Sequence, residues 1–197
     1  LDVPGAKPRT NNTEAISIRK GQTVIFGNPE NKQEDLVVGL TKPLPAIDKK
    51  DKTNFSVNDG QYLFDIINAT SSYIVGRSRG EFILLPKKGV NLPGSLYDED
   101  LQLSICYDFI QSVANIDVNG FGLSFIQNGN VVDSLRSVTR DKVLVSKIEN
   151  SEGLENASSI ILRSDAVMID RGDLAAEIGF DALYNAVEKI SRKTKSR

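Results

Sequence analysis

The sequence predicts an α/β protein in two parts, βα units on a parallel sheet and a small all-β domain inserted near the start of the chain. Short β-rich runs separated by turn residues fill residues 12–88, whereas predicted strands and helices alternate within residues 89–197. Such alternation is typical of βα units on a parallel sheet. We therefore expect three parts. Residues 1–11 end a strand and lead into the all-β domain, the all-β domain spans 12–88, and the βα region spans 89–197.

The all-β domain is predicted from alternating apolar residues and from turn residues. Ile16 and Ile18 alternate with Ser17 and Arg19, as in a strand with one buried face. Further strands are expected at residues 23–26, 36–40, 61–66, 72–75 and 81–85. Turn residues separate them, as in Asn58-Asp59-Gly60. Many short strands of this kind predict a small barrel or sandwich.

The βα region is predicted from a pattern that switches between helical and strand periods. Helices are expected at residues 98–115, 129–140, 152–163 and 180–195, and strands at 120–126, 143–149 and 166–170. These three strands cannot close a barrel of eight, and the short run Leu1–Val3 would add a fourth. Because the chain opens inside that run, we expect it to be an excised or truncated piece.

The composition limits the chemistry that this chain can perform. The 197 residues include no histidine and one cysteine, Cys106, which excludes a Cys/His zinc site, a Ser-His-Asp triad and a Cys-His dyad within the chain. Cys106 lies in an apolar run and is expected in the core. A net charge of -2 and the lack of an apolar run of about 20 residues predict no nucleic-acid and no membrane partner. Carboxylates, lysines, arginines, hydroxyls and backbone groups remain.

One group of charged residues follows two predicted strands. Lys147 and Glu149 are two residues apart, so both side chains point to the same face of their strand. Asp173 follows the next strand, and the carboxyl ends of barrel strands are where catalytic residues gather. Two carboxylates there can share a hard divalent cation, and a lysine beside them would stabilise a phosphoryl or enolate oxyanion. Taken alone, however, a Lys-x-Glu pattern is more often a structural ion pair.

Longer strings resemble the pyruvate kinase family, in the family's order and spacing along essentially the whole chain. They are Asp2-Val-Pro-Gly-Ala-Lys-Pro-Arg-Thr10, Lys87-Lys-Gly-Val-Asn-Leu-Pro-Gly94, Ser124-Phe-Ile126, Lys147-Ile-Glu-Asn150 with Glu152-Gly153, and Arg171-Gly-Asp-Leu174 with Glu177-Ile178. The resemblance implies a partial parallel (β/α)8 TIM-type barrel with an inserted all-β lid. It also implies the glycolytic reaction of phosphoenolpyruvate and ADP to pyruvate and ATP.

The resemblance implies roles for the residues at the active centre. Lys147 would be the catalytic lysine that stabilises charge on the phosphoryl group and the enolate oxygen. Glu149 and Asp173 would hold Mg²⁺ or Mn²⁺, and the backbone N–H groups of Gly172 and Asp173 would bind the substrate carboxylate. This arrangement would make the chain part of a metal-dependent phosphotransferase.

The resemblance also implies roles for residues near the two ends of the lid. Arg9, which would also assist catalysis, and Lys87 would bind the nucleotide or its phosphates. Asp2 would belong to a monovalent-cation corner. Because family members with Lys at the position of Lys7 tend not to need K⁺, we expect no K⁺ requirement. A cytoplasmic homotetramer is the assembly and location that the family implies.

Several residues depart from the family pattern, which leaves two alternatives open. The departures are Ala6, Pro8, Asn11, Asn58, Gln127, Asp170, Ala175, Ala176 and Gly179. Asp170 adds a third carboxylate, which would repel a phosphorylated substrate. The first alternative is a catalytically impaired relative that binds metal and a phosphoenolpyruvate-type ligand. The second is a metal-enolate enzyme that acts on another keto acid.

Overall fold

The computed structural model describes residues 1–29, 36–46 and 53–195 and divides the chain into two compact units. The βα unit contains Leu1–Ala6 and Tyr97–Arg197, and the β unit contains Lys7–Leu96. Each unit has its own hydrophobic core and is described by itself.

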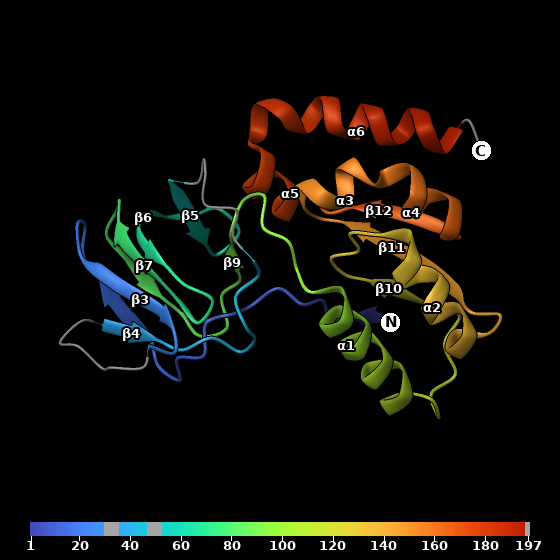
Figure 1. The fold of residues 1–197 in the computed structure, drawn as a ribbon, viewed down its shortest axis with the longest axis horizontal. Coiled ribbons are helices and arrows are strands. Elements are labelled where there is room, and N and C mark those ends of the chain that lie inside the picture. The colour runs from blue at the N-terminus through green and yellow to red at the C-terminus, as the bar shows by residue number, and fades with distance from the viewer. Residues whose placement is uncertain (30–35, 47–52, 196–197) are drawn as a thin grey trace. The chain divides into compact units, whose positions relative to one another are not determined.

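A four-stranded parallel sheet forms the centre of the βα unit (Figure 1). Its strands, in spatial order, are β1 (Asp2–Val3), β10 (Gly120–Leu123), β11 (Val143–Ile148) and β12 (Ala166–Ile169). All three pairings are parallel, and the spatial order equals the chain order. The predicted α/β class is confirmed, as is the expectation that Leu1–Val3 supplies a fourth strand.

Six helices alternate with these strands. They are α1 (Glu99–Ser112), α2 (Gly129–Thr139), α3 (Ser151–Glu155), α4 (Ala157–Arg163), α5 (Arg171–Ile178) and α6 (Phe180–Lys195). The prediction of one helix at residues 152–163 is wrong, because Asn156 ends α3 and begins α4. Its side-chain amide donates to the backbone oxygen of Gln127 at 2.9 Å and to Glu152 at 2.7 Å, which holds the break. Helix α5 was not predicted.

Side-chain caps explain where three of the helices begin. Asp98 accepts from the N–H of Leu101 at 2.9 Å, and Asn150 accepts from that of Gly153 at 2.9 Å. Asn128 caps α2 in the same way. Each cap satisfies a backbone donor that the helix itself leaves without a partner. The cap at Asn150 ends β11 within one residue of Glu149, so the end of this strand is fixed.

One face of the sheet packs against the helices. The core of the βα unit contains Val3, Cys106, Ile110, Phe121, Leu123, Ile126, Val131, Val132, Leu135, Leu144 and Ile160. Cys106 is fully buried there, as predicted. The opposite face of the sheet exposes apolar side chains, since Val143 and Met168 are 44% and 48% exposed.

The β unit consists of a six-stranded and a two-stranded sheet. The larger sheet has the order β4 (Leu36–Val38), β3 (Thr23–Gly27), β7 (Tyr73–Ser78), β6 (Tyr62–Ala69), β5 (Asn54–Val57) and β9 (Val90–Asn91). The smaller pairs β2 (Ile16–Ile18) with β8 (Phe82–Leu84). All pairings are antiparallel except β3 with β4. Strands β5 and β9 were not predicted.

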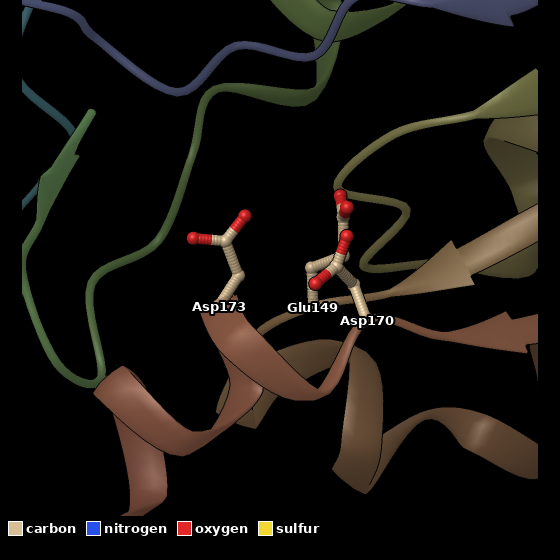
Figure 2. Close-up of side chains that lie close together, drawn as sticks. All are labelled: Glu149, Asp170 and Asp173. Carbon is tan, nitrogen blue, oxygen red and sulfur yellow. The ribbon is translucent and has the colours of Figure 1, made fainter. Parts of the chain in front are cut away.

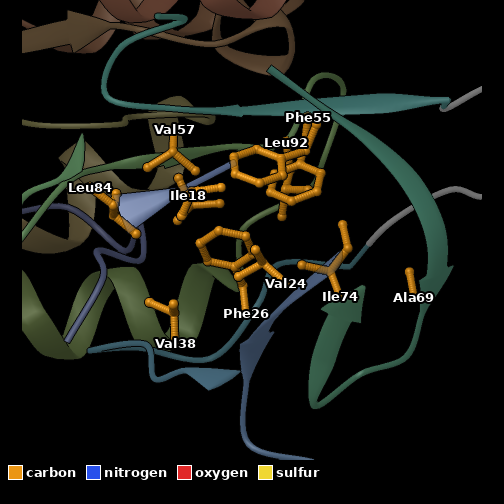
Figure 3. Close-up of a cluster of buried hydrophobic side chains, with 12 residues drawn as sticks. Ile18, Val24, Phe26, Val38, Phe55, Val57, Ala69, Ile74, Leu84 and Leu92 are labelled. Atoms are coloured by element: carbon orange, nitrogen blue, oxygen red, sulfur yellow. The ribbon is translucent and has the colours of Figure 1, made fainter. Parts of the chain in front are cut away.

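Phe26, Phe55 and Phe64 belong to the β-unit core, and Figure 3 labels Phe26 and Phe55. The rings of Phe55 and Phe64 stack at 5.1 Å, and Phe26 meets them edge-on at 5.4 and 5.1 Å. The tight turn before β6 brings Phe55 and Phe64 face to face. In that turn Asn58, Asp59 and Gly60 all have positive φ, which is the conformation that such turn residues tolerate.

Candidate functional site

Lys147 and Glu149 lie at the carboxyl end of β11 and face each other. The Lys147 Nζ is 3.1 Å from Glu149 Oε1. The predicted common face is therefore correct, although the strand ends at Ile148, one residue earlier than expected. Both side chains are largely buried, with 11% of Lys147 and 1% of Glu149 exposed.

Glu149 is held by a backbone donor from the neighbouring strand end. The N–H of Phe125 donates to Glu149 Oε2 at 2.5 Å. Burial raises the pKa of Glu149 to about 7, although Lys147 and the Phe125 N–H each oppose that rise. Burial therefore disfavours the ionised form of Glu149 relative to its protonated form, and a cation bound nearby would favour the ionised form.

Two more carboxylates complete an acidic cluster with Glu149. Asp170 follows β12 and precedes α5, and Asp173 lies in the first turn of α5. Each of the three residues has a carboxylate oxygen within 4.8 Å of the others, and Figure 2 shows the three side chains on the same side of α5. Hard divalent cations prefer such oxygen ligands, so the donor set fits a metal ion.

Lys147 is surrounded by acceptors from other strand ends. Its Nζ lies 3.4 Å from Asp2, 3.9 Å from Asp170 and 3.3 Å from the hydroxyl of Ser124. Burial lowers the pKa of Lys147, but the carboxylates of Glu149 and Asp2 outweigh this effect and hold the pKa above its usual value. Carboxylates thus outnumber the ammonium group, and the excess negative charge favours binding of a divalent cation.

Asp170 lies beside the predicted metal ligands, where the sequence placed an added negative charge. Register explains this position, because Ile169 pairs with Ile148 and so places Asp170 beside Glu149. From the sequence we treated this carboxylate as a source of repulsion, whereas its oxygen is also close enough to Glu149 and Asp173 to share a cation with them.

The first turn of α5 presents backbone N–H groups at the same strand ends. Gly172 and Asp173 lie in that turn. Asp170 precedes the helix, but its side chain caps no N–H among the described residues. The start of a helix attracts anions because its first N–H groups lack helical partners. The predicted carboxylate-binding position of Gly172 and Asp173 therefore adjoins the acidic cluster.

The remaining predicted site residues belong to the β unit. Two chain segments lie side by side there, since the N–H of Thr10 donates to the carbonyl of Lys88 at 2.8 Å. This pairing brings Arg9 to Lys87, whose carbonyl accepts from the Arg9 guanidinium at 3.2 Å. Lys7 is 5% exposed, and its Nζ lies 3.4 Å from Asp59. The structure thus places the Arg9 guanidinium beside the backbone of Lys87.

Gln127, one of the departures from the family pattern, is buried, and its side chain is hydrogen-bonded to two other residues. Its side-chain amide donates to the carbonyl of Tyr97 at 2.9 Å and accepts from the N–H of Tyr97 at 3.1 Å. Its oxygen also accepts from the side chain of Asn150 at 2.9 Å. Gln127 therefore links Tyr97, just before α1, to Asn150, the cap of α3.

The βα sheet with a carboxylate cluster and a lysine at its strand ends defines an α/β protein with a candidate divalent-cation site. A family model described as pyruvate kinase, barrel domain, matches residues 1–197. The chain therefore belongs to the pyruvate kinase family, and the resemblance seen in the sequence is confirmed.

Relatives from distant organisms agree with this assignment. The chain is 28% identical over 198 residues to a cytosolic pyruvate kinase isozyme of Nicotiana tabacum, covering 94% of the chain and 39% of the relative. It is 29% identical over 196 residues to a pyruvate kinase of Thermoplasma acidophilum, covering 96% of the chain and 34% of the relative. The chain thus spans well under half the length of these relatives. Within the described ranges, no helix is long and apolar enough to cross a membrane.

Proposed function

We propose that this chain is the lid and the central barrel portion of a pyruvate kinase, which transfers a phosphoryl group from phosphoenolpyruvate to ADP. The observation that carries the proposal is the acidic cluster of Glu149, Asp170 and Asp173 beside the buried Lys147. In this reading the four parallel strands belong to a (β/α)8 barrel, and residues 12–88 are the inserted lid. The protein would act in glycolysis, as a cytoplasmic homotetramer.

The residues of the βα unit would bind the metal ion, stabilise charge on the reacting phosphate and orient the substrate. Glu149 and Asp173, with Asp170 as an added donor, would hold Mg²⁺ or Mn²⁺, which when bound supplies positive charge to phosphate and enolate oxygens. The ammonium of Lys147 would stabilise the same developing charge. The N–H groups of Gly172 and Asp173 would orient the substrate carboxylate.

The residues of the β unit would bind the nucleotide and make K⁺ unnecessary. Arg9 and Lys87 lie on paired segments and would contact ADP or its phosphates. Lys7 would replace the monovalent cation. Asp2, which belongs to the βα unit, would be the acid of the monovalent-cation corner. Closure of the lid would exclude water, so that the phosphoryl group passes to ADP.

A second candidate is a relative that binds metal and ligand with little turnover. Asp170 favours it, because its carboxylate lies 3.9 Å from Lys147 Nζ and competes with a phosphate for this ammonium group. Action on another keto acid through the same metal-enolate chemistry is the remaining alternative.

The test is pyruvate formation from phosphoenolpyruvate, ADP and Mg²⁺ by the protein that contains residues 1–197, with and without K⁺. Lys147→Met is expected to lower the turnover rate about 100-fold or more, as loss of an oxyanion donor does. Lys142→Met is the matched control, since Lys142 pairs with the exposed Asp117. The wild type should not respond to K⁺.

Other results would redirect the proposal. Metal-dependent binding of phosphoenolpyruvate without turnover by the folded protein would favour the binding relative, and Asp170 would then be the first residue to replace. Proton exchange at the methyl group of pyruvate or another keto acid, without ADP phosphorylation, would favour the keto-acid enzyme.

A further inference from the structure

The turn that follows β10 has an unusual backbone conformation. Phe125 has φ of 56°, a left-handed value that is rare for a residue with a bulky side chain. This conformation accompanies two contacts to the site. The Phe125 N–H donates to Glu149 Oε2 at 2.5 Å, and the Ser124 hydroxyl lies 3.3 Å from Lys147 Nζ. A strained residue of this kind persists only where its surroundings hold it.

A buried glutamine on α1 holds this turn from one side. Gln102 is 2% exposed, and its side-chain Nε2 donates to the carbonyl of Ser124 at 3.0 Å. Its Oε1 accepts from the backbone N–H of Ala6 at 2.6 Å. Because one partner is a donor and the other an acceptor, they fix the orientation of the amide. Gln102 thus ties the turn to the segment that follows β1.

Close packing also confines this turn. A Cβ at Gly5 would lie 3.0 Å from the Ser124 carbonyl oxygen and 3.0 Å from Phe125 Cβ, so this position has little room for a side chain. The Phe125 ring meets the Tyr97 ring edge-on at 5.4 Å. The turn is therefore confined between Gly5, Tyr97 and Gln102.

We propose that Gln102 is a positioning residue, which holds Ser124 and Phe125 so that the Phe125 N–H fixes Glu149 as a metal ligand. The metal part of this inference rests on the proposed function. The side chain of Gln102 bonds the backbone of Ala6 and Ser124 and the sulfur of Cys106, so it acts on Glu149 through the backbone of the turn. Partners that orient a metal ligand in this way are commonly worth 10- to 100-fold in metal affinity.

The experiment compares Mn²⁺ affinity among four forms of the full chain at one pH. Gln102→Met keeps the shape but loses both backbone hydrogen bonds. Gly5→Ala leaves Gln102 in place and presses on the turn directly. Thr139→Val is the control, because it removes a buried hydrogen bond to Leu135 at the far end of α2. We expect the first two variants to bind Mn²⁺ about tenfold more weakly or worse, and the control to bind like wild type.

A second readout tests positioning without any metal. The Phe125 amide proton, which donates a short hydrogen bond in wild type, should give a downfield NMR signal that exchanges slowly. This signal should shift upfield in Gln102→Met and Gly5→Ala and stay in Thr139→Val. The inference is overturned if both variants keep the signal and bind Mn²⁺ like the control, since Gln102 would then stabilise the fold only.

The two readouts separate this inference from the proposed function. If wild type binds no Mn²⁺, the metal site of the proposed function fails, and the Phe125 amide signal alone decides on Gln102. If Gln102→Met does not fold, Gln102→Glu gives the decision, because a carboxylate can still accept from the Ala6 N–H but has no donor for the Ser124 carbonyl. A Phe125 signal and an Mn²⁺ affinity that are unchanged in Gln102→Glu would overturn the inference.

Discussion

At the scale of single residues, Glu149 is the acid whose burial determines the response of the site to pH. Its pKa of about 7 in the folded chain exceeds the ordinary value of 4.5, because burial disfavours the carboxylate. Between these two values the folded state binds more protons than the unfolded state. The free energy of unfolding should therefore fall as pH rises through this window and level off above it.

This pH dependence can be measured with Glu149→Gln in the presence of a chelator. The amide can still accept from the Phe125 N–H but does not titrate. From about pH 5 to about pH 8 the wild type should lose up to about 3 kcal/mol more stability than the variant. Lys147 adds no slope there, because its raised pKa lies above the window. Parallel curves for wild type, Glu149→Gln and the exposed-residue control Glu155→Gln would contradict the buried-acid explanation.

The residues of the site differ in how far the sequence could predict them. Lys147 and Glu149 share a face because strand side chains alternate, and this rule needs only one strand. Asp170 joins the cluster through the register between β11 and β12, which depends on the pairing of two strands and not on the pattern within either one. The roles of Gln102 and Phe125 were not predicted, because they depend on hydrogen bonds between backbone atoms and side chains that are far apart in the sequence.

At the scale of secondary structure, strands and helices with clear periods were predicted and those with mixed signals were not. Helix α2 has a capping Asn128 and a regular apolar face, and its position was predicted within one residue. Helix α5 was missed because Gly172 and Gly179 bracket a short and weakly patterned segment.

A glycine in β7 shows how closely the strands of the β unit pack. A Cβ at Gly76 would lie 2.6 and 2.7 Å from atoms of the Phe55 ring, which is itself stacked on Phe64. Gly76→Ala should therefore destabilise the fold by about 1–3 kcal/mol, as overpacking of a core does. Urea unfolding followed by circular dichroism measures this loss.

Gly80 provides the matched control for that substitution. A Cβ there meets no atom within 4 Å among the described residues, so Gly80→Ala should change stability by less than about 1 kcal/mol. Equal effects of the two substitutions would show that backbone flexibility, and not the Phe55 contact, accounts for the glycine in β7.

At the scale of the whole molecule, the parallel sheet is covered by helices on one face only. Parallel sheets are normally buried on both faces. Proteins also protect the edge strands of a sheet, for example by covering them or by closing the sheet into a barrel. Here Val143 and Met168 are exposed on the open face, and β1 and β12 are the edges. The relatives are more than twice as long as the matched segment. Under the proposed function, further barrel strands of the same protein would cover this face.

Residues 1–197 by themselves are accordingly expected to associate through the open face of the sheet. Met168→Gln places a polar group on that face and should lower the apparent mass in sedimentation velocity, because apolar area drives such association. Leu162→Gln is the control, since Leu162 is 66% exposed on α4, a helix on the other face of the sheet. Association that Leu162→Gln weakens and Met168→Gln does not would assign the contact to the helical face. In that case the sheet would tolerate an open face, and the case for barrel strands that cover it would lose this support.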